Sequence, residues 1–252
     1  MARIFITGSA DGLGQMAASL LISQGHDVVL HARSSERAQH ALSKVPGAKN
    51  VLIADLSSMD ETKALAGQVN ALGKFDAVIH NAGVYRVDSK LIVAVNTLAP
   101  YILTCLIQRP KRLIYLSSGM HSYGKLNLES LANNPNRISY SDSKLHVVTL
   151  SMAVARKWPE VYSNSVDPGW VATKMGGRGA PDNLEKGFET QSWLAVSEDE
   201  NAKVSGRYFF HKKISRHNND ADDITSQENF LSVCEQATGV KVPNGHNGDN
   251  RS

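Results

Sequence analysis

The stretch that decides the fold is Thr7-Gly8-Ser9-Ala10-Asp11-Gly12-Leu13-Gly14, close to the N-terminus. It follows a short apolar run, 3–7 (RIFIT), and precedes a segment, 12–24, whose small and apolar residues recur at helical spacing. The glycine spacing is G-x-x-x-G-x-G, a variant of a dinucleotide-binding fingerprint in which glycines permit a sharp turn and close approach to a pyrophosphate. A tight turn alone would also use three glycines, but the position between a strand and a helix N-terminus favours dinucleotide binding.

The same alternation of short apolar runs and helical segments continues along the chain. Further strands are predicted at 26–31, 50–54, 75–80, 112–116, 161–166 and 207–210. Helices are predicted at 34–45, at 139–156 and near 222–237. A further helix is predicted to begin after a cap at Ser57 or Ser58, with a capping box to Glu61. Strands alternating with helices indicate a parallel sheet covered on both faces. We therefore expect an α/β, doubly wound Rossmann fold with seven strands, a mainly parallel sheet, and a ligand at the carboxyl ends of the strands.

Length and composition limit the class of protein. A chain of 252 residues with 42% apolar and 20% charged residues is typical of one α/β domain. We expect this single domain to span 1–242 and the polar, glycine-rich end, 243–252, to be a disordered tail. The longest apolar runs are shorter than the ~20 residues that span a bilayer, and no secretory signal is visible, so we expect a cytoplasmic protein without a membrane span.

Metal ions and nucleic acids are not expected as ligands. The nine histidines contain no H-E-x-x-H motif, and the two cysteines, Cys105 and Cys234, are far apart and are expected to be buried thiols. The net charge of +3 is small, and the basic cluster Lys212-Lys213…Arg216 has no nucleic-acid module around it.

The end of the second predicted strand bears on the choice of cofactor. An acidic residue there would bind a ribose 2′-hydroxyl and favour NAD, but this chain has His31-Ala32-Arg33. The guanidinium of Arg33 can pair with a 2′-phosphate, which favours NADP(H) over NAD(H), although a solvated arginine would look the same in sequence. Asp11 in the glycine loop has the wrong sign for a further phosphate contact.

A tyrosine and a lysine point to acid–base chemistry. Tyr140 and Lys144 are four residues apart and therefore share one face of the predicted helix. A nearby ammonium favours the phenolate, so we expect the pKa of Tyr140 to lie below its usual ~10. The same spacing recurs at Tyr208 and Lys212, but there it falls in a predicted strand, and we interpret that pair as a core tyrosine and a surface lysine.

Taken together, these residues resemble the short-chain dehydrogenase/reductase family, from the first strand to about residue 210. The matching residues are Thr7-Gly8…Gly12…Gly14, Asp55-Leu56, Asn81-Ala82-Gly83, Asn96, Ser118, Tyr140…Lys144 and 167–173 (DPGWVAT). The resemblance implies that Tyr140 protonates a carbonyl, that Lys144 lowers its pKa, and that Ser118 stabilises the developing oxyanion. Asn96 would hold the water of a proton relay. The choice between Ser117 and Ser118 stays open.

The resemblance also implies a set of cofactor contacts. They are Thr7, Gly8, Ser9, Asp11, Gly12, Leu13, Gly14, Arg33, Asp55, Leu56, Asn81, Ala82, Gly83, Tyr140, Lys144, Pro168, Gly169, Val171 and Thr173. The substrate would contact Ser118, Tyr140 and Trp170, with 174–200 as a covering segment and Met175 and Trp193 as candidate apolar lining; ordinary core packing would explain these apolar side chains equally well. The C-terminal part looks like the retinol-dehydrogenase-like branch, which implies NADPH-dependent reduction of lipophilic aldehydes and ketones.

The helix predicted before Pro110 looks short, and because this helix packs between subunits in many members of the family, the oligomeric state stays open between monomer, homodimer and tetramer. His80 stands where the family usually has Asn, and only 12 residues, 84–95, separate Gly83 from Asn96.

From the motifs and the family resemblance together, we expect an NADP(H)-dependent carbonyl reductase or alcohol dehydrogenase. The alternatives are a non-catalytic NADP(H)-sensing or partner-binding module and, less well matched in glycine spacing and length, an enzyme of sugar epimerisation or dehydration.

Overall fold

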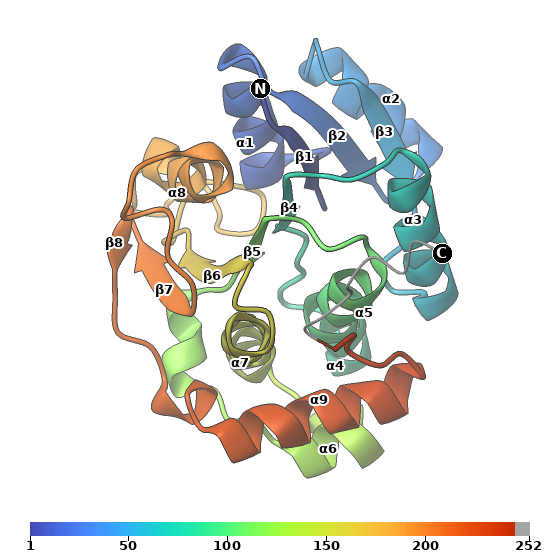
Figure 1. Cartoon of the computed structure of the whole chain (residues 1–252), viewed down its shortest axis with the longest axis vertical. Helices are drawn as coiled ribbons and strands as arrows, with labels where there is room; N and C mark the ends of the chain where they lie inside the picture. The colour runs from blue at the N-terminus through green and yellow to red at the C-terminus, as the bar shows by residue number, and fades with distance from the viewer. Residues whose placement is uncertain (245–252) are drawn as a thin grey trace.

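The computed structural model describes residues 1–244, so residues 245–252 of the predicted tail lie outside the described part. Within it, the strands form one sheet of eight in the order β3-β2-β1-β4-β5-β6-β7-β8 (Figure 1). The strands are β1 (Arg3–Ile6), β2 (Asp27–Ala32), β3 (Asn50–Ile53), β4 (Ala77–His80), β5 (Arg112–Leu116), β6 (Tyr162–Asp167), β7 (Arg207–Phe210) and β8 (Lys213–Ile214). Neighbouring strands are parallel except β7 and β8. The doubly wound α/β fold is confirmed; the eighth strand was missed because two residues are too few to show a pattern.

Helices cover both faces of the sheet (Figure 1). One face carries α1 (Gly12–Ser23), α2 (Ser35–Lys44) and α8 (Leu184–Val196). The other carries α3 (Met59–Ala71), α4 (Ser89–Ile92), α5 (Ala99–Leu106) and α7 (Tyr140–Lys157), with α6 (Leu128–Asn133) and α9 (Ile224–Thr238) outside α7. Short helical turns are η1 (Val93–Leu98), η2 (Gly119–Tyr123), η3 (Pro135–Arg137) and η4 (Asn219–Ala221).

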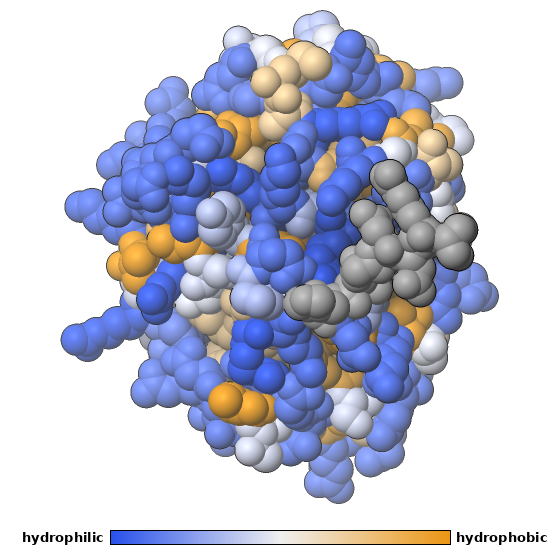
Figure 2. Space-filling model, viewed as in Figure 1, coloured by the Kyte–Doolittle hydropathy of each residue, from blue (hydrophilic) through white to orange (hydrophobic). Residues whose placement is uncertain are grey.

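The apolar strands explain this layering. Successive side chains of a strand point to opposite faces, and in β1 Phe5 packs in the core beneath α3 and α5 while Ile4 and Ile6 pack beneath α1. All three side chains are fully buried, as expected for a parallel sheet with helices on both faces. The outer surface seen in Figure 2 is mostly hydrophilic, with apolar side chains in small separate groups.

Polar caps fix the helix that carries the tyrosine–lysine pair. Ser139 accepts a hydrogen bond from the Asp142 backbone, and the Asp142 carboxylate accepts one from the Ser139 backbone, forming a complete capping box at the start of α7. Asp142 also accepts from Lys125 N at 2.7 Å and Asn127 Nδ2 at 3.0 Å. These bonds fix Tyr140 as the first residue of α7.

The predicted capping box of α3 forms only in part. Ser58 accepts a hydrogen bond from Glu61 N at 3.3 Å, as expected. The Glu61 carboxylate, however, accepts from Asp55 N at 2.8 Å, because the backbone N–H of Ser58 is already bonded to the Asp55 carbonyl. Glu61 therefore braces the turn after β3 instead of closing the box.

One apolar helical stretch is longer than the sequence suggested. Ser89–Leu106, formed by α4, η1 and α5, is 18 residues long and apolar enough to cross a membrane by length and composition alone. In the fold, 72% of it is buried against the sheet and the neighbouring helices. The stretch comes closer to spanning length than the continuous apolar runs of the sequence suggested, and burial within the core explains its apolar character.

Candidate active site

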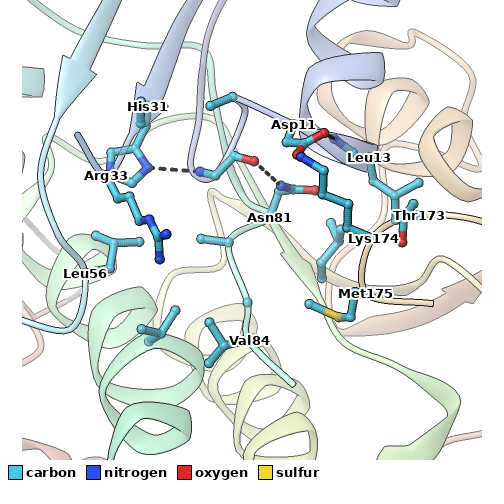
Figure 3. A pocket seen from close by; sticks show the side chains of 18 of the residues that line it. Asp11, Leu13, His31, Arg33, Leu56, Asn81, Val84, Thr173, Lys174 and Met175 are labelled. Carbon is cyan, nitrogen blue, oxygen red and sulfur yellow. Dashed lines mark hydrogen bonds and ion pairs between the residues drawn. The ribbon is translucent and has the colours of Figure 1, made fainter. Parts of the chain in front are cut away.

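A cavity of about 570 Å³ lies at the carboxyl ends of the strands, around β1 and β4, where the strand order of the sheet reverses. This is the position at which open α/β sheets bind their ligands. The lining residues are Gly8, Ala10, Asp11, Gly12, Leu13, His31, Ala32, Arg33, Arg37, Asp55, Leu56, Ser57, Asn81, Ala82, Gly83, Val84, Leu91, Val95, Leu116, Ser117, Tyr140, Lys144, Pro168, Thr173, Lys174 and Met175. Figure 3 shows part of this lining.

The glycine loop lies at one wall of the cavity and can hold only glycine at two positions. Gly8 has φ of +62°, and a Cβ there would lie 2.8 Å from the Ala82 Cα. A Cβ at Gly14 would lie 2.4 Å from the Asn81 Nδ2. Both positions therefore need glycine for the close packing of the loop and α1 against the segment after β4.

A buried histidine that the sequence analysis did not single out fixes this loop. His31 Nδ1 accepts a hydrogen bond from Gly8 N at 3.0 Å, and its Nε2 donates to the Ala54 carbonyl at 3.0 Å (Figure 3). Burial lowers the pKa of His31 to about 4, so the ring stays neutral at physiological pH. The only sequence signal was its position at the end of the second strand, which was interpreted for Arg33 alone.

Residues predicted to contact the cofactor also brace the loop. Asn81 donates through Nδ2 to the carbonyls of Thr7 at 3.0 Å and Gly8 at 3.1 Å. Thr7 is buried and accepts a hydrogen bond from Ala82 N at 3.1 Å through its hydroxyl. Ser9 is fully buried and bonds to the Ile6 carbonyl. Thr7, Ser9 and Gly14 are therefore outside the cavity lining, and they shape the loop from behind.

Basic side chains gather at the end of the cavity near β2 and β3. Arg33 lines it and lies close enough to Asp55 to contribute to the lowered pKa of that carboxyl, after the hydrogen bonds from Ser57. Arg37, which the sequence analysis missed, lines the same end. Figure 3 shows the Arg33 guanidinium pointing into the cavity.

Asp11 does not present an unpaired negative charge to this end. Its carboxylate pairs with Lys174, lies 3.4 Å from Arg37 NH2, and caps α1 by accepting from Gly12 N at 2.8 Å. The ion pair with Lys174 lowers the pKa of Asp11 most strongly, against the effect of burial. The pair also links the glycine loop to the segment after β6 across the cavity mouth.

Tyr140 and Lys144 lie at the opposite end of the cavity, on the first turns of α7. Lys144 is buried, its Nζ donates to the Leu116 carbonyl at 2.9 Å, and it lies 5.5 Å from the centre of the Tyr140 ring. Burial lowers the pKa of Lys144 to about 8. Burial raises the pKa of Tyr140 to about 12, with the Ser118 hydroxyl opposing the rise. The expected lowering of the Tyr140 pKa by Lys144 is thus wrong for this structure, because desolvation outweighs other influences.

The two serines after β5 have different surroundings. Ser117 is buried, and its hydroxyl donates to the Lys144 carbonyl at 2.9 Å inside α7. The Ser118 hydroxyl accepts from Met120 N at 3.3 Å and lies close enough to the Tyr140 phenol to oppose the rise in its pKa. Of the two serines, Ser118 is therefore the one whose hydroxyl acts on Tyr140, even though Ser117 is the serine that lines the cavity.

Asn96 lies in η1, a π-helical turn between α4 and α5. Its Nδ2 donates to the Val84 carbonyl at 3.0 Å and to Ser143 Oγ at 3.1 Å, and its Oδ1 accepts from Val84 N at 2.8 Å. A Cβ at Gly83 would lie 3.5 Å from this Oδ1 and 3.4 Å from Lys144 Nζ. The amide of Asn96 and the ammonium of Lys144 therefore converge on the same point above Gly83.

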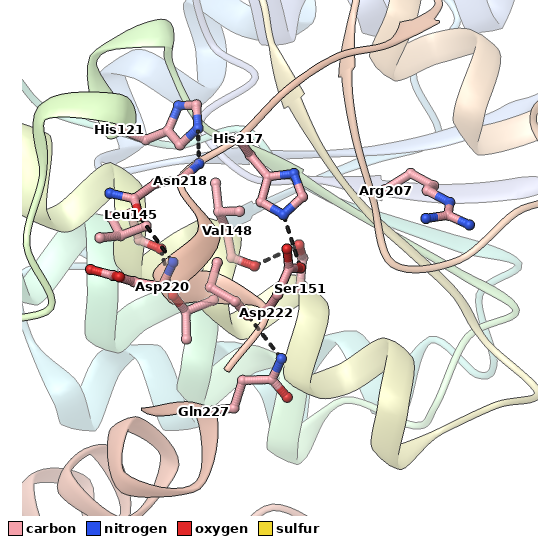
Figure 4. Close-up of polar contacts among 12 residues, drawn as sticks. His121, Leu145, Val148, Ser151, Arg207, His217, Asn218, Asp220, Asp222 and Gln227 are labelled. Atoms are coloured by element: carbon pink, nitrogen blue, oxygen red, sulfur yellow. Dashed lines mark hydrogen bonds and ion pairs between the residues drawn. The ribbon is translucent and has the colours of Figure 1, made fainter. Parts of the chain in front are cut away.

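His121, three residues after Ser118, contacts the segment between β8 and α9 (Figure 4). His121 Nδ1 donates to the Ser118 carbonyl at 2.7 Å, and its Nε2 accepts from Asn218 N at 3.3 Å. His217 contacts Asp222 at 2.9 Å, which closes the same segment on itself. His121 is buried and holds the backbone of Ser118 in place, which agrees with a structural role.

The segment after β6 contributes less to the cavity than its length suggests. Pro168, Thr173, Lys174 and Met175 line it, whereas Gly169 and Val171 lie against Asp182 and Gly187. Trp170 is 61% exposed, and its indole Nε1 donates to the Gly176 carbonyl at 2.8 Å. The following helix, α8, packs against α1 and the sheet, so the covering part of 174–200 is confined to its first residues.

Two smaller expectations concern aromatic residues. Trp193 does not line the cavity: its ring packs edge-on against Phe209 at 5.8 Å in the core beneath α8. Tyr208 is buried in β7, and Lys212 pairs with Glu189 at 2.5 Å on the surface, as interpreted for the second tyrosine–lysine pair. Cys105 and Cys234 are both buried free thiols.

Comparisons with known proteins agree with this site. The model of the family described as short chain dehydrogenase matches residues 2–109. The chain is 46% identical, over 97% of its length and the whole of the relative, to an uncharacterised oxidoreductase of Emericella nidulans. It is 44% identical, over 96% of its length and again the whole relative, to the short-chain dehydrogenase chyC of Penicillium rubens. The chain belongs to the short-chain dehydrogenase/reductase family. It is therefore an NAD(P)-dependent oxidoreductase of the class that acts on alcohols and carbonyl compounds.

Solved structures and more distant relatives refine this picture. A protein of Mycobacterium paratuberculosis has the same fold, with a TM-score of 0.79 at 19% identity over 96% of this chain and 95% of that one. A short-chain dehydrogenase of Shigella flexneri, complexed with NADP, matches with a TM-score of 0.64 at 20% identity over 84% and 97% of the two chains. Retinol dehydrogenase 14 of Mus musculus is only 27% identical over 82% of this chain and 76% of the relative. The retinol-dehydrogenase-like branch is thus a distant likeness, and the fungal oxidoreductases match far better.

Proposed function

We propose that this short-chain dehydrogenase/reductase is an NADP(H)-dependent carbonyl reductase that acts on lipophilic ketones or aldehydes. The observation that carries the proposal is that the hydroxyl of Ser118 acts on the phenol of Tyr140, whose ring lies 5.5 Å from the buried ammonium of Lys144. This group lies at one end of a cavity whose other end carries Arg33 and Arg37. One chain therefore holds a proton donor for a carbonyl and cations for a phosphate at opposite ends of one site.

The cavity fits a dinucleotide. The glycine loop, held by His31 and Asn81, brings backbone and the N-terminus of α1 to the wall where a pyrophosphate would bind. Arg33 and Arg37 favour a 2′-phosphate over a bare ribose because guanidinium groups bind phosphate through charge-assisted hydrogen bonds. Asp11 does not oppose this preference, since Lys174 and Arg37 balance its charge.

The residues of the other end would act on the substrate. When bound, the nicotinamide supplies or accepts a hydride. Ser118 and Tyr140 would hydrogen-bond the carbonyl oxygen, and Tyr140 would donate its proton as negative charge develops there. The high pKa of the phenol, about 12, keeps that proton in place at neutral pH. Lys144, with a pKa of about 8, is charged at neutral pH and stabilises the phenolate that remains.

A path for the returning proton can be placed above Gly83. Lys144 Nζ and Asn96 Oδ1 converge there, and Oδ1 keeps a lone pair beyond its bond to Val84 N. A water held between the two atoms would restore the proton to Tyr140 through Lys144. This assigns to Asn96 the relay role that the family resemblance implied.

Apolar side chains near Tyr140 support a lipophilic substrate. The Tyr85 ring lies 4.6 Å from the Tyr140 ring, centre to centre. Met175, in the segment after β6, lines the same cavity as Tyr140 and is 45% exposed. Such exposed apolar side chains around a polar centre are typical of a site that takes up apolar compounds.

The test is a fluorescence titration of NADPH and NADH with the wild type and Arg33→Ala, followed by turnover with a panel of ketones and aldehydes. Arg137→Ala, at an exposed arginine in η3, is the matched control. We expect the wild type to bind NADPH more tightly, and Arg33→Ala to lose most of this preference while Arg137→Ala keeps it. Equal affinity of the wild type for both cofactors would overturn the NADP assignment. NADPH binding without any turnover would favour the non-catalytic alternative.

A further inference from the structure

The proposed mechanism gives no role to Asp167, the last residue of β6. β5 and β6 lie side by side with Leu116 opposite Val166, and Ser117 N donates to the Val166 carbonyl at 2.8 Å. The side chain of Asp167 therefore emerges at the same sheet edge as Ser118. The residue is half-buried.

The two oxygens of this carboxylate have different surroundings. Oδ1 accepts from Gly169 N at 2.9 Å and closes the turn after β6. Oδ2 lies toward Gly119, where an added Cβ would be 3.0 Å away, and Gly119 itself is exposed. The absence of a side chain at Gly119 leaves an approach to Oδ2 from the same side as Ser118.

A buried hydroxyl faces the same carboxylate. Tyr208 projects from β7 toward Asp167, and within residues 1–244 its hydroxyl has no well-directed hydrogen-bond partner. The Asp167 carboxylate is the polar group that this hydroxyl faces, and it adds to the effect of burial in raising the pKa of Tyr208. On the other side, the His121 ring lies 4.4 Å from the Tyr208 ring and fixes it in place.

The charge of Asp167 acts on the catalytic group. Burial is the main cause of the raised pKa of Tyr140, and Asp167 adds to it. Asp167 likewise opposes the lowering of the Lys144 pKa by burial. A carboxylate this close disfavours negative charge on the carbonyl oxygen during reduction, unless a donor on the substrate pairs with it.

We propose that Asp167 selects carbonyl compounds that carry a hydrogen-bond donor, a hydroxyl or N–H, on the atom next to the carbonyl carbon. While Ser118 and Tyr140 hold the carbonyl oxygen, the neighbouring donor bonds to Oδ2 of Asp167. The inference rests on the proposed carbonyl reduction and adds a substrate class to it. It makes Asp167 a specificity-determining residue of the site.

The experiment compares two ketones that differ only in the donor, 2-hydroxyacetophenone and 2-methoxyacetophenone, with NADPH as cofactor. Asp167→Asn keeps an oxygen for the Gly169 N–H and removes the charge. Asp182→Asn, in the same loop but bonded to Trp170 N, is the matched control. The measured quantity is the ratio of kcat/KM for the two ketones.

We expect the wild type and Asp182→Asn to prefer the hydroxy ketone by about tenfold or more, the effect of a hydrogen bond to a charged acceptor. Asp167→Asn should bring this ratio close to one. Equal kcat/KM of the wild type for both ketones would overturn the inference, and this outcome does not depend on whether Asp167→Asn folds. A wild-type ratio of kcat/KM in folded Asp167→Asn would overturn it as well. Reduction of neither ketone despite NADPH binding would contradict the proposed function and this inference with it.

Discussion

The buried His80 makes the stability of the fold depend on pH in a way that can be calculated. His80 ends β4, and its ring stacks on Tyr115 at 4.7 Å and contacts Thr104 Oγ1 through Nε2 at 3.3 Å. Its Nδ1 is buried and has no hydrogen-bond partner within residues 1–244. Burial therefore lowers the pKa of His80 from 6.5 to about 3, because the protonated ring would hold an unsatisfied charge.

The sign and size of the effect follow from linkage. The folded-state pKa lies below the unfolded one, so the unfolded state binds more protons between pH 6.5 and 3, and stability falls as pH decreases through that range. At pH 5 the unfolded histidine is almost fully protonated and the folded one is neutral, which costs about 2 kcal/mol relative to pH 7.5. His80→Asn removes the titrating group and should remove this part of the pH dependence.

The assay is urea unfolding of the wild type and His80→Asn at pH 7.5 and pH 5. Because Asn does not titrate, the loss of unfolding free energy between the two pH values should be smaller in the variant by about 2 kcal/mol. The same substitution at the exposed His40 is the control and should leave the wild-type loss unchanged. Equal losses in the wild type and His80→Asn would refute the assignment of a buried neutral ring at this position.

Three further predictions concern the site. The rate of reduction should fall as pH rises through about 8, where Lys144 loses its proton. In Lys144→Arg, the remaining activity should fall only at higher pH, because arginine keeps its proton. The same midpoint in the pH–rate profiles of the wild type and the variant would contradict this. Gly14→Ala should weaken NADPH binding at least tenfold in a fluorescence titration, because its Cβ would clash with the segment after β4, whereas Gly67→Ala, where nothing lies within 4 Å, should bind normally. Asp142→Ala should lower the free energy of unfolding by at least about 2 kcal/mol, because it leaves three donors unpaired; the exposed Asp60→Ala should cost far less, and equal costs would count against the capping role.

The fold was predictable because its signals are local and repeated. The glycine loop, the apolar strands and the caps at Ser58 and Ser139 each have a pattern within a few residues. The two-residue strand β8 has no such pattern, since it exists only by pairing with β7. The length of the apolar stretch at 89–106 was underestimated because polar residues interrupt it in sequence while the helix continues.

The candidate site was predictable where residue type and spacing carry the chemistry, as for Tyr140, Lys144 and the glycine loop. The roles of His31, Arg37 and Lys174 depend on contacts between segments far apart in the chain, such as the pairing of Lys174 with Asp11. The pKa of Tyr140 depends on burial, which spacing alone does not give. Spacing therefore identified the reacting groups, and the tertiary structure was needed for what holds and tunes them.

The central claim is that Tyr140 donates a proton to a carbonyl substrate. The most direct measurement is the single-turnover rate of alcohol formation from a reducible ketone by the wild type and Tyr140→Phe, each saturated with NADPH. Tyr123→Phe, at a side chain that is 83% exposed, is the control. We expect Tyr140→Phe to bind NADPH as before and to be at least about a hundredfold slower, the contribution expected of a general acid, while the control keeps the wild-type rate. A wild-type rate of alcohol formation in Tyr140→Phe would contradict the account.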